Sequence, residues 1–266
     1  MDTLLDATYK TEGDKPVIEL FYLSKDKKED KEIVEVKDFQ PYFYALPKGD
    51  VSDLQKELAD ESFPQIQETK IVRKKDVREE KEVLKIVVKN PRNVPEIRDR
   101  IGDLKNCLET REDSIRFIQR YIMDSGITPM KGASNKNLRI AAFDIETTPD
   151  PNDPVNHIPI MISYADNTGL RKVWNHKYDS GLDYLEKLED EKAMILEFIE
   201  TVKNQKIDII VTYNGDNFDF GVIQERCRRL KIPFSLGAKD YEVKLERRGM
   251  DMGARVTGRP HIDLYP

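Results

Sequence analysis

Three carboxylates in this sequence occupy positions that suit the binding of a divalent metal ion. Two of them, Asp144 and Glu146, lie two residues apart at the end of the apolar run Leu138–Ile145. Side chains two residues apart on a strand project from the same face, and carboxylates so close raise each other's pKa unless a cation lies between them. Mg²⁺ or Mn²⁺ suits such oxygen ligands. The alternative is a polar strand end that leads into a turn over residues 147–154.

The third carboxylate, Asp219, follows a second apolar run, Ile207–Val211. The intervening Asn-Gly pair at 214–215 indicates a turn, and Asp216 or Asn217 is expected to cap the helix that follows. Asp219 would then lie in the first helical turn, near the carboxyl end of a strand, where open α/β sheets bind ligands. The alternative is helix capping, which explains Asp216 better than Asp219. Three carboxylates on one rim would form a two-metal phosphodiesterase site.

The part of the chain that carries these carboxylates alternates between strands and helices. Apolar, β-branched runs predict strands, and apolar residues at helical spacing predict helices. The predicted strands are Leu138–Ile145, Ile158–Ala165, Arg171–Trp174, Ile207–Thr212, Tyr241–Leu245, Ala254–Thr257 and His261–Tyr265, and the predicted helices are Glu191–Lys203 and Phe220–Leu230. A three-strand meander followed by helix–strand–helix predicts an α/β domain with a mixed sheet and helices on its faces.

The first part of the chain predicts a strand-rich α+β domain. Its predicted strands are Pro16–Leu23, Ile33–Val36, Tyr42–Leu46 and Val83–Val88, and its predicted helices are Val51–Leu58 with Ser52 as N-cap, Glu96–Leu104 and Ser114–Met123. Small and polar residues gather at 132–137, which is typical of a linker. We therefore expect two domains, at residues 1–134 and 135–266.

Composition excludes several classes of protein. The 266 residues carry 44 Lys+Arg and 50 Asp+Glu, a formal net charge of −6. The apolar runs are too short to span a membrane, and no signal peptide is apparent. Cys107, Cys227 and three histidines form neither a disulfide framework nor a zinc-binding spacing. The sequence predicts a soluble, cytoplasmic protein without a membrane partner.

Charge is unevenly distributed along the chain. Basic residues outnumber acidic ones at residues 71–120, by 14 to 10, and at residues 221–260, by 10 to 5. Either region is accounted for by a solvated face. Both also leave a local anion-binding surface open on an acidic chain.

Several segments resemble, in order, parts of the family B DNA polymerases. Residues 143–148 (Phe-Asp-Ile-Glu-Thr-Thr) resemble the first exonuclease motif, and residues 211–220 (Val-Thr-Tyr-Asn-Gly-Asp-Asn-Phe-Asp-Phe) resemble the second. Residues 159–166 are similar to the strand between these motifs in archaeal members, and residues 258–265 to the strand between the second and third motifs. The similarity extends to the N-terminal segments 15–21, 39–46, 93–98 and 127–129.

This resemblance implies an N-terminal domain followed by a 3′–5′ exonuclease domain with a ribonuclease H-like (DnaQ-type) fold, truncated at its C-terminal side. It implies that Asp144, Glu146 and Asp219 bind the catalytic metal ions, two Mg²⁺ or Mn²⁺ in the complete domain. Asn214 and Phe218 would hold the frayed 3′ end, whose terminal phosphodiester is hydrolysed in proofreading.

Archaeal members also carry a template-uracil pocket in the N-terminal domain. The positions that resemble its members are Tyr9, Pro41, Tyr42, Phe43, Val94, Arg98, Ile115, Phe117 and Arg120. An aromatic and apolar pocket would accept a flipped uracil and exclude a methylated base, while the two arginines would hold neighbouring phosphates. Arg116 stands where relatives have proline, which would reshape the pocket wall. The alternative is that the aromatic residues simply belong to the core.

The third motif of the family, Tyr-x-x-x-Asp, does not follow Asp219 in this sequence, and the palm, fingers and thumb are missing. We therefore expect the N-terminal portion of a replicative DNA polymerase, with weak or no exonuclease activity as a fragment. The implied partners are single-stranded and primer-template DNA, the remaining polymerase domains in the same or a separate chain, and a sliding clamp bound through the missing part. The alternatives are a non-catalytic module that binds single-stranded DNA and uracil, and a free-standing 3′–5′ exonuclease.

Overall fold

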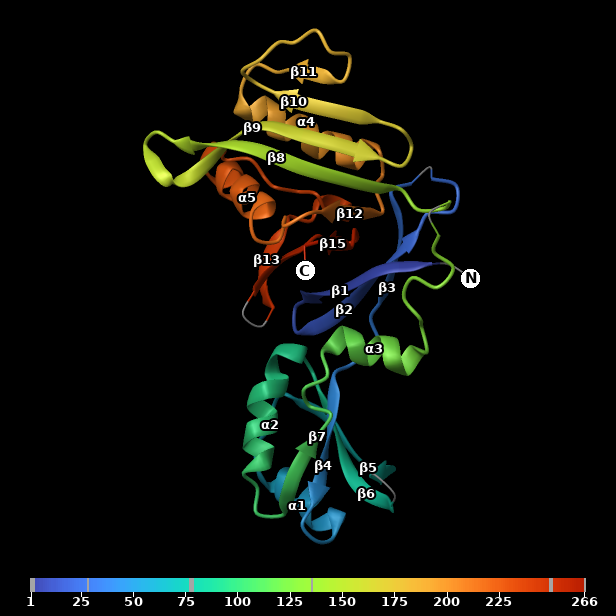
Figure 1. Ribbon diagram of the computed structural model, residues 1–266. Coiled ribbons are helices and arrows are strands. Elements are labelled where there is room, and N and C mark those ends of the chain that lie inside the picture. Colours follow the sequence, from blue (N-terminus) through green and yellow to red (C-terminus); the bar gives the residue numbers. More distant parts are fainter. Residues whose placement is uncertain (1–2, 28, 77–78, 135, 249–250, 266) are drawn as a thin grey trace. The chain divides into compact units, whose positions relative to one another are not determined.

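The computed structural model describes residues 3–27, 29–76, 79–134, 136–248 and 251–265 (Figure 1). The chain divides into two compact units that are interleaved in sequence. Unit 1 consists of Met1–Ala7, Leu20–Val34 and Pro129–Pro266, and unit 2 consists of Thr8–Glu19 and Glu35–Thr128. The division predicted at residue 134 lies near the last crossing between the units, and the assignment of two functional domains stays a prediction. Asn135, in the predicted linker, lies outside the described residues.

Unit 1 contains a six-stranded mixed sheet in the order β11-β10-β9-β8-β12-β15. Its strands are β8 (Ile140–Asp150), β9 (Asp153–Asp166), β10 (Arg171–Asn175), β11 (Leu185–Lys187), β12 (Ile209–Thr212) and β15 (His261–Asp263). The first three form the predicted antiparallel meander, and β12 runs parallel to both β8 and β15. The parallel edge strand β11 was not predicted.

Alternation along β8 separates the two faces of this sheet. Phe143 and Ile145 are buried, whereas Asp144 and Glu146 are exposed, as the two-residue period of a strand requires. The buried face packs against α4 (Glu191–Asn204) and α5 (Asp219–Leu230), which Figure 1 shows against the sheet. The carboxylates of the first motif therefore project from the face that these helices leave open.

Unit 2 contains a four-stranded antiparallel sheet in the order β5-β6-β4-β7. Its elements follow one another as a βαββαβ unit: β4 (Tyr42–Pro47), α1 (Val51–Asp60), β5 (Ile66–Asp76), β6 (Glu79–Val88), η1 (Pro91–Asn93), α2 (Val94–Gly102) and β7 (Cys107–Arg111). Leu54 of α1 and Ile97 of α2 share a core with Phe43 of the sheet. Tyr44 and Val83 form a separate, smaller cluster on the other face. Both helices thus cover one face of this sheet.

The remaining elements are short. A three-stranded sheet contains β1 (Leu4–Glu12), β2 (Lys15–Leu23) and β3 (Lys31–Val36), and unit 1 also contains η2 (Ala238–Asp240) and the hairpin of β13 (Lys244–Arg248) and β14 (Asp251–Arg255). In unit 2, α3 (Phe117–Ser125) ends at Gly126, whose φ of 67° suits a glycine C-cap. No helix in the described part of the chain combines the length and apolar character needed to cross a membrane.

Three local predictions were wrong. β8 continues past Glu146 to Asp150, with a register shift after Glu146, so the first motif lies inside a strand rather than at its end. The N-cap of α1 is Asp50, whose carboxylate accepts a hydrogen bond from the N–H of Ser52. Neither Asp216 nor Asn217 caps α5, because Phe218 occupies the N-cap position without a side-chain hydrogen bond.

Candidate active site

Asp219 is tied directly to the strand that carries the first motif. β12 pairs with β8 only as far as Val211 opposite Ala142. Three residues further along β8, the backbone N–H of Ile145 donates a hydrogen bond to Oδ1 of Asp219 at 3.1 Å. Since Ile145 lies between Asp144 and Glu146, this bond brings the second motif to the centre of the first.

The electrostatics of Asp219 show that Asp144 is its neighbour. Asp219 is only 3% exposed. Burial, followed by the charge of Asp144, raises the pKa of Asp219 from 3.8 to about 6, and the charge of Asp263 acts in the same direction. The buried Asp219 and the exposed Asp144 repel each other, and a divalent cation bound by both carboxylates would offset this repulsion.

Glu146 shares an exposed face of β8 with Asp144 but is not part of a complete ligand cluster. Within the described residues, no group of three Asp, Glu, His or Cys side chains is arranged to hold a metal ion. The structure therefore brings together two of the three predicted ligands, Asp144 and Asp219.

Asp263, at the end of β15, holds the loop that carries the second motif. Its Oδ1 accepts a hydrogen bond from the N–H of Asn214 at 2.7 Å, and its Oδ2 accepts one from the N–H of Asp216 at 2.8 Å. Asn214 adopts a left-handed φ of 65°, and its carbonyl accepts from the N–H of Phe218 at 3.1 Å. A Cβ at Gly215 would collide with the side chain of Thr212, so the loop requires glycine there.

His261, on β15, also contacts the loop that carries the second motif. Its buried ring lies between Thr212 and Asp216, with Nε2 2.8 Å from Thr212 Oγ1 and Nδ1 3.2 Å from Asp216 Oδ1. Asp216 Oδ1 also accepts a hydrogen bond from the N–H of Ala254 at 2.6 Å. Sequence reasoning noted the segment 258–265 as a motif but missed that its acidic and imidazole side chains position the loop.

The predicted 3′-end residues, Asn214 and Phe218, both lie in the loop that precedes Asp219. Asn214 is half-buried, and the half-buried ring of Phe218 makes an edge contact with His157, with centroids 5.4 Å apart. On the open face of the sheet, Asp144 lines a depression of about 690 Å³ together with Ala142, Val211 and Tyr213. The site thus combines carboxylates, an aromatic ring and a mostly apolar hollow.

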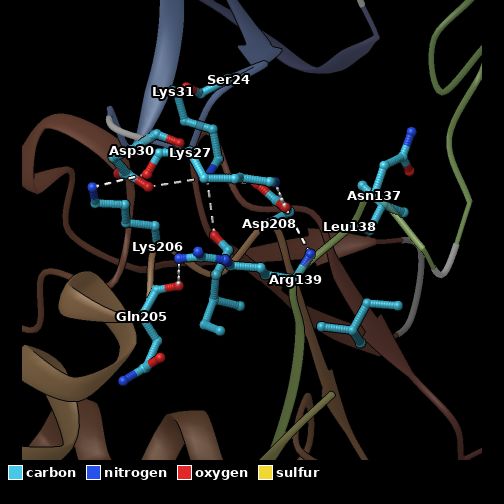
Figure 2. A network of polar contacts seen from close by, with 12 residues as sticks. Ser24, Lys27, Asp30, Lys31, Asn137, Leu138, Arg139, Gln205, Lys206 and Asp208 are labelled. Atoms are coloured by element: carbon cyan, nitrogen blue, oxygen red, sulfur yellow. Dashed lines mark hydrogen bonds and ion pairs between the residues drawn. The ribbon is translucent and has the colours of Figure 1, made fainter. Parts of the chain in front are cut away.

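A buried polar network holds the starts of β8 and β12 at the far end of the same sheet (Figure 2). Asp208 is fully buried and lies 2.6 Å from Nζ of Lys27 and 3.0 Å from Nζ of Lys31. Its Oδ2 also accepts a hydrogen bond from the N–H of Arg139 at 2.7 Å. Arg259 pairs with Asp30 through two bonds of 2.7 and 2.8 Å. The two strands that carry the site therefore begin at one common anchor.

The residues expected in the uracil pocket separate into two groups in unit 2. Tyr9 makes an edge contact with Phe117 at 5.3 Å between ring centroids, and the guanidinium of Arg120 lies 4.7 Å from the centroid of Tyr42. Phe43 and Val94 belong instead to the core beneath α1 and α2. This division follows from alternation along β4, which sends Tyr42 and Phe43 to opposite faces.

The other residues expected in this pocket lie at the periphery of these groups. Pro41 is buried, and Ile115 is half-buried. Arg98 is engaged with Asp99, 2.7 Å away. Arg116 is exposed, and its φ of −60° is the value that proline also adopts. The φ angle at this position is therefore compatible with proline as well as with arginine. Phe39 and Asp124 were missed: Phe39 packs on Phe117, and Asp124 accepts a hydrogen bond from Tyr42 at 2.7 Å.

Comparison with known proteins agrees with this fold. The protein-family model for the exonuclease domain of DNA polymerase family B matches residues 131–266 of this chain. DNA polymerases from Desulfurococcus sp. (strain Tok) and Thermococcus sp. (strain 9oN-7) are each 39% identical over 99% of this chain and 34% of their own length. The chain belongs to the family B DNA polymerases and spans about a third of the length of these relatives.

A solved structure shows the same fold over nearly the whole chain. It is that of the family B DNA polymerase from the hyperthermophilic archaeon Pyrobaculum calidifontis, with a TM-score of 0.81 and 24% identity over 99% of this chain and 36% of that one. The predicted fold, an α+β N-terminal part followed by a ribonuclease H-like α/β part, is confirmed.

Proposed function

We propose that this chain is the N-terminal portion of a replicative family B DNA polymerase and carries part of its proofreading 3′–5′ exonuclease site. The observation that carries this proposal is the bond from Ile145 to Asp219, which sets the second-motif carboxylate beside Asp144. The substrates would be single-stranded and primer-template DNA. The remaining polymerase domains, in the same or a separate chain, and a sliding clamp bound through them would be the partners.

Asp144 and Asp219 are the residues that would hold a divalent ion, with Glu146 on the same face of β8 as a further ligand. Their oxygen donors fit Mg²⁺ or Mn²⁺. Two bound ions would activate water and offset the charge that develops on the phosphate.

The chain itself would orient the DNA. Asp263 accepts hydrogen bonds from the loop amides of Asn214 and Asp216, which supports a role of this loop, through Asn214 and Phe218, in holding the 3′ end. Phe218 would stack on the terminal base, because an aromatic face accepts any base. The apolar hollow next to Asp144 would exclude water from part of the bound strand.

Incubation of this chain with a 5′-labelled single-stranded DNA and Mg²⁺ or Mn²⁺ tests the proposal. We expect weak or no shortening, because the third-motif aspartate and tyrosine are not supplied by these residues. Adding the remaining polymerase domains should restore shortening, and Asp144→Ala should abolish it. The control Asp183→Ala removes an exposed carboxylate elsewhere in unit 1. Strong shortening by the chain alone, abolished by Asp144→Ala, would instead identify a free-standing exonuclease.

A second function is favoured by the cluster of Tyr9, Tyr42, Phe117 and Arg120 in unit 2. We propose that this cluster contributes to a template-uracil pocket, with Arg120 and Arg98 near the flanking phosphates. Tighter binding of a uracil-containing single strand than of its thymine counterpart, reduced by Phe117→Ala, would support it. Equal affinity for both strands would reject it.

A further inference from the structure

A pocket in unit 1 is lined by basic and hydroxyl side chains from three segments of the chain. Its volume is about 430 Å³, within the range of sites that hold small molecules. The residues that line it include Thr3, Ser24, Lys25, Lys27, Lys136 and Asn137, all of which belong to unit 1. The described lining contains three lysines and no carboxylate, so this pocket favours an anion.

The buried ion pairs next to this pocket contain more positive than negative charge. Asp208 lies 2.6 Å from Nζ of Lys27 and 3.0 Å from Nζ of Lys31 (Figure 2). Nζ of Lys31 also lies 3.0 Å from Asp30, which is paired with Arg259. Within this described network, three cationic side chains therefore share two carboxylates, which leaves an excess of one positive charge.

The pKa of Lys31 reflects this excess. Burial, followed by the charge of Arg259, lowers the pKa of Lys31, although its two carboxylate partners act in the opposite direction. Lys27 connects the network with the pocket, because its side chain lines the pocket and is 21% exposed, whereas that of Lys31 is fully buried. An anion beside Lys27 would supply the missing negative charge.

The neutral side chains of the pocket are held in place by the protein. Thr3 Oγ1 and Asn137 Nδ2 each donate a hydrogen bond to a backbone carbonyl at 3.0 Å. Ser24 is 5% exposed, and its Oγ lies 3.4 Å from Oδ1 of the exposed Asp26. An amide has two N–H donors and an ammonium has three, so Asn137 and Lys27 retain donors for a ligand.

We propose that this pocket binds an anion with two linked phosphoryl groups, either free pyrophosphate or the phosphate chain of a nucleotide. Lysine is a common phosphate ligand that acts as a point charge. The described lining contains no arginine, whose planar fork matches carboxylates. The pocket is larger than a single phosphate, and its lysines come from two segments, so it has room and charge for two phosphoryl groups.

Occupancy of the pocket would stabilise unit 1. The segment after β2 supplies Lys25 and Lys27, and the segment before β8 supplies Lys136. A ligand held by both segments would join them, and Lys27 also binds Asp208, just before β12. The anion would therefore act on the common anchor of β8 and β12. This binding does not require the exonuclease site.

Thermal unfolding of the full chain in EDTA tests this binding. Pyrophosphate and deoxyadenosine triphosphate would each be titrated, with orthophosphate and sodium chloride at the same ionic strength as references. Because a ligand that binds only the folded state stabilises it, we expect pyrophosphate to raise the Tm by at least about 3 °C at saturation. A rise with both ligands would identify the phosphate chain of a nucleotide as a ligand, and a rise with pyrophosphate alone would identify the free anion; both results support the proposal.

Two double variants separate the pocket from general charge effects. Lys25→Gln with Lys136→Gln removes two exposed ammonium groups from the lining. Lys187→Gln with Lys192→Gln removes the same charge from exposed positions elsewhere in unit 1. We expect the pocket variant to need about tenfold more pyrophosphate for the same rise in Tm, and the control variant to respond as the wild type does. Lys27 is left unchanged, because it also supports the buried network.

Acetylation of lysines, followed by mass spectrometry, locates the ligand. Pyrophosphate should slow the acetylation of Lys25 and Lys136 and leave that of Lys187 and Lys192 unchanged. No rise in Tm with pyrophosphate, an equal rise with orthophosphate, or equal weakening in both double variants would overturn the proposal. Since no DNA is present and EDTA removes metal ions, exonuclease activity does not enter this test, and its failure would leave the exonuclease proposal unchanged.

Discussion

The backbone N–H of Ile145 donates to the carboxylate of Asp219 at 3.1 Å, so the helix of the second motif is fixed to the strand of the first. One oxygen of Asp219 is thereby committed to the protein. The carboxylate is nevertheless buried next to Asp144, and without a cation this arrangement is electrostatically unfavourable.

Asp219→Asn should stabilise the metal-free protein at neutral pH. The folded pKa, about 6, is above the ordinary 3.8, so the favourable contribution of Asp219 is present below about pH 4 and is lost as the pH rises through 6. Asparagine keeps an acceptor for Ile145 without the charge. Thermal or urea unfolding in EDTA should show a gain of about 1–3 kcal/mol at about pH 7.5 and almost none near pH 4. A gain that does not change with pH would contradict this explanation.

Asp263→Ala should destabilise unit 1 and disorder the second-motif loop. Three backbone amides, those of Asn214, Asp216 and Tyr265, lose a charged acceptor, which costs about 2–4 kcal/mol in the free energy of unfolding. Asp263→Asn should restore part of this loss, because its side-chain oxygen remains an acceptor. Denaturant titration measures both, with Asp183→Ala as the exposed control. A loss of less than about 0.5 kcal/mol on Asp263→Ala would show that the loop does not depend on this residue.

Asp208→Asn should be among the most destabilising single changes in unit 1. It leaves the buried ammonium of Lys31 without its main counter-charge, at a cost of about 3–5 kcal/mol. Burial, followed by the charge of Arg259, already lowers the pKa of Lys31. The variant Glu186→Gln removes one partner of the exposed pair with Lys172 and should cost under about 1 kcal/mol. Similar losses in the two variants, measured by denaturant unfolding, would contradict the assignment of Asp208 as an anchor.

Cys107 and Cys227 should not react with a thiol reagent in the native protein. Both are buried and free, and burial raises the pKa of the Cys227 thiol to about 12 and that of Cys107 in the same direction. Only the thiolate reacts, so reagent at about pH 8 should label neither until urea is added. Ser114→Cys, at an exposed position, should label at once. Rapid labelling of the wild type would show that the buried environment opens readily.

Sequence patterns predicted most of the elements, and they predicted that Asp144 and Glu146 share one face of β8. Both predictions depend on local periodicity. The meander, α4 and the strand leading to Asp219 all carry regular apolar spacing. β5 (Ile66–Asp76) was not predicted, because charged residues at both odd and even positions hide the two-residue alternation of a strand. Asp208 and Lys31 are 177 positions apart and carry no periodic signal, so their pairing is visible only in three dimensions.

The N-caps illustrate the same limit at short range. Asp216 has the sequence features of a helix cap, but its carboxylate is used by Ala254 and His261 from later in the chain. Tertiary contacts overrode the local preference there. At α1, by contrast, the cap is displaced by only two residues, from Ser52 to Asp50, within the uncertainty of any helix boundary.

The interleaving of the two units limits how the protein can be dissected. The chain passes between them four times, after Ala7, Glu19, Val34 and Thr128. A protein that began at residue 129 would lack Lys27 and Lys31, and Asp208 would remain as a buried charge without either lysine. Cutting this polypeptide once would therefore not release an intact unit 1, and excision of unit 2 would require the early and late segments of unit 1 to be rejoined by new linkers.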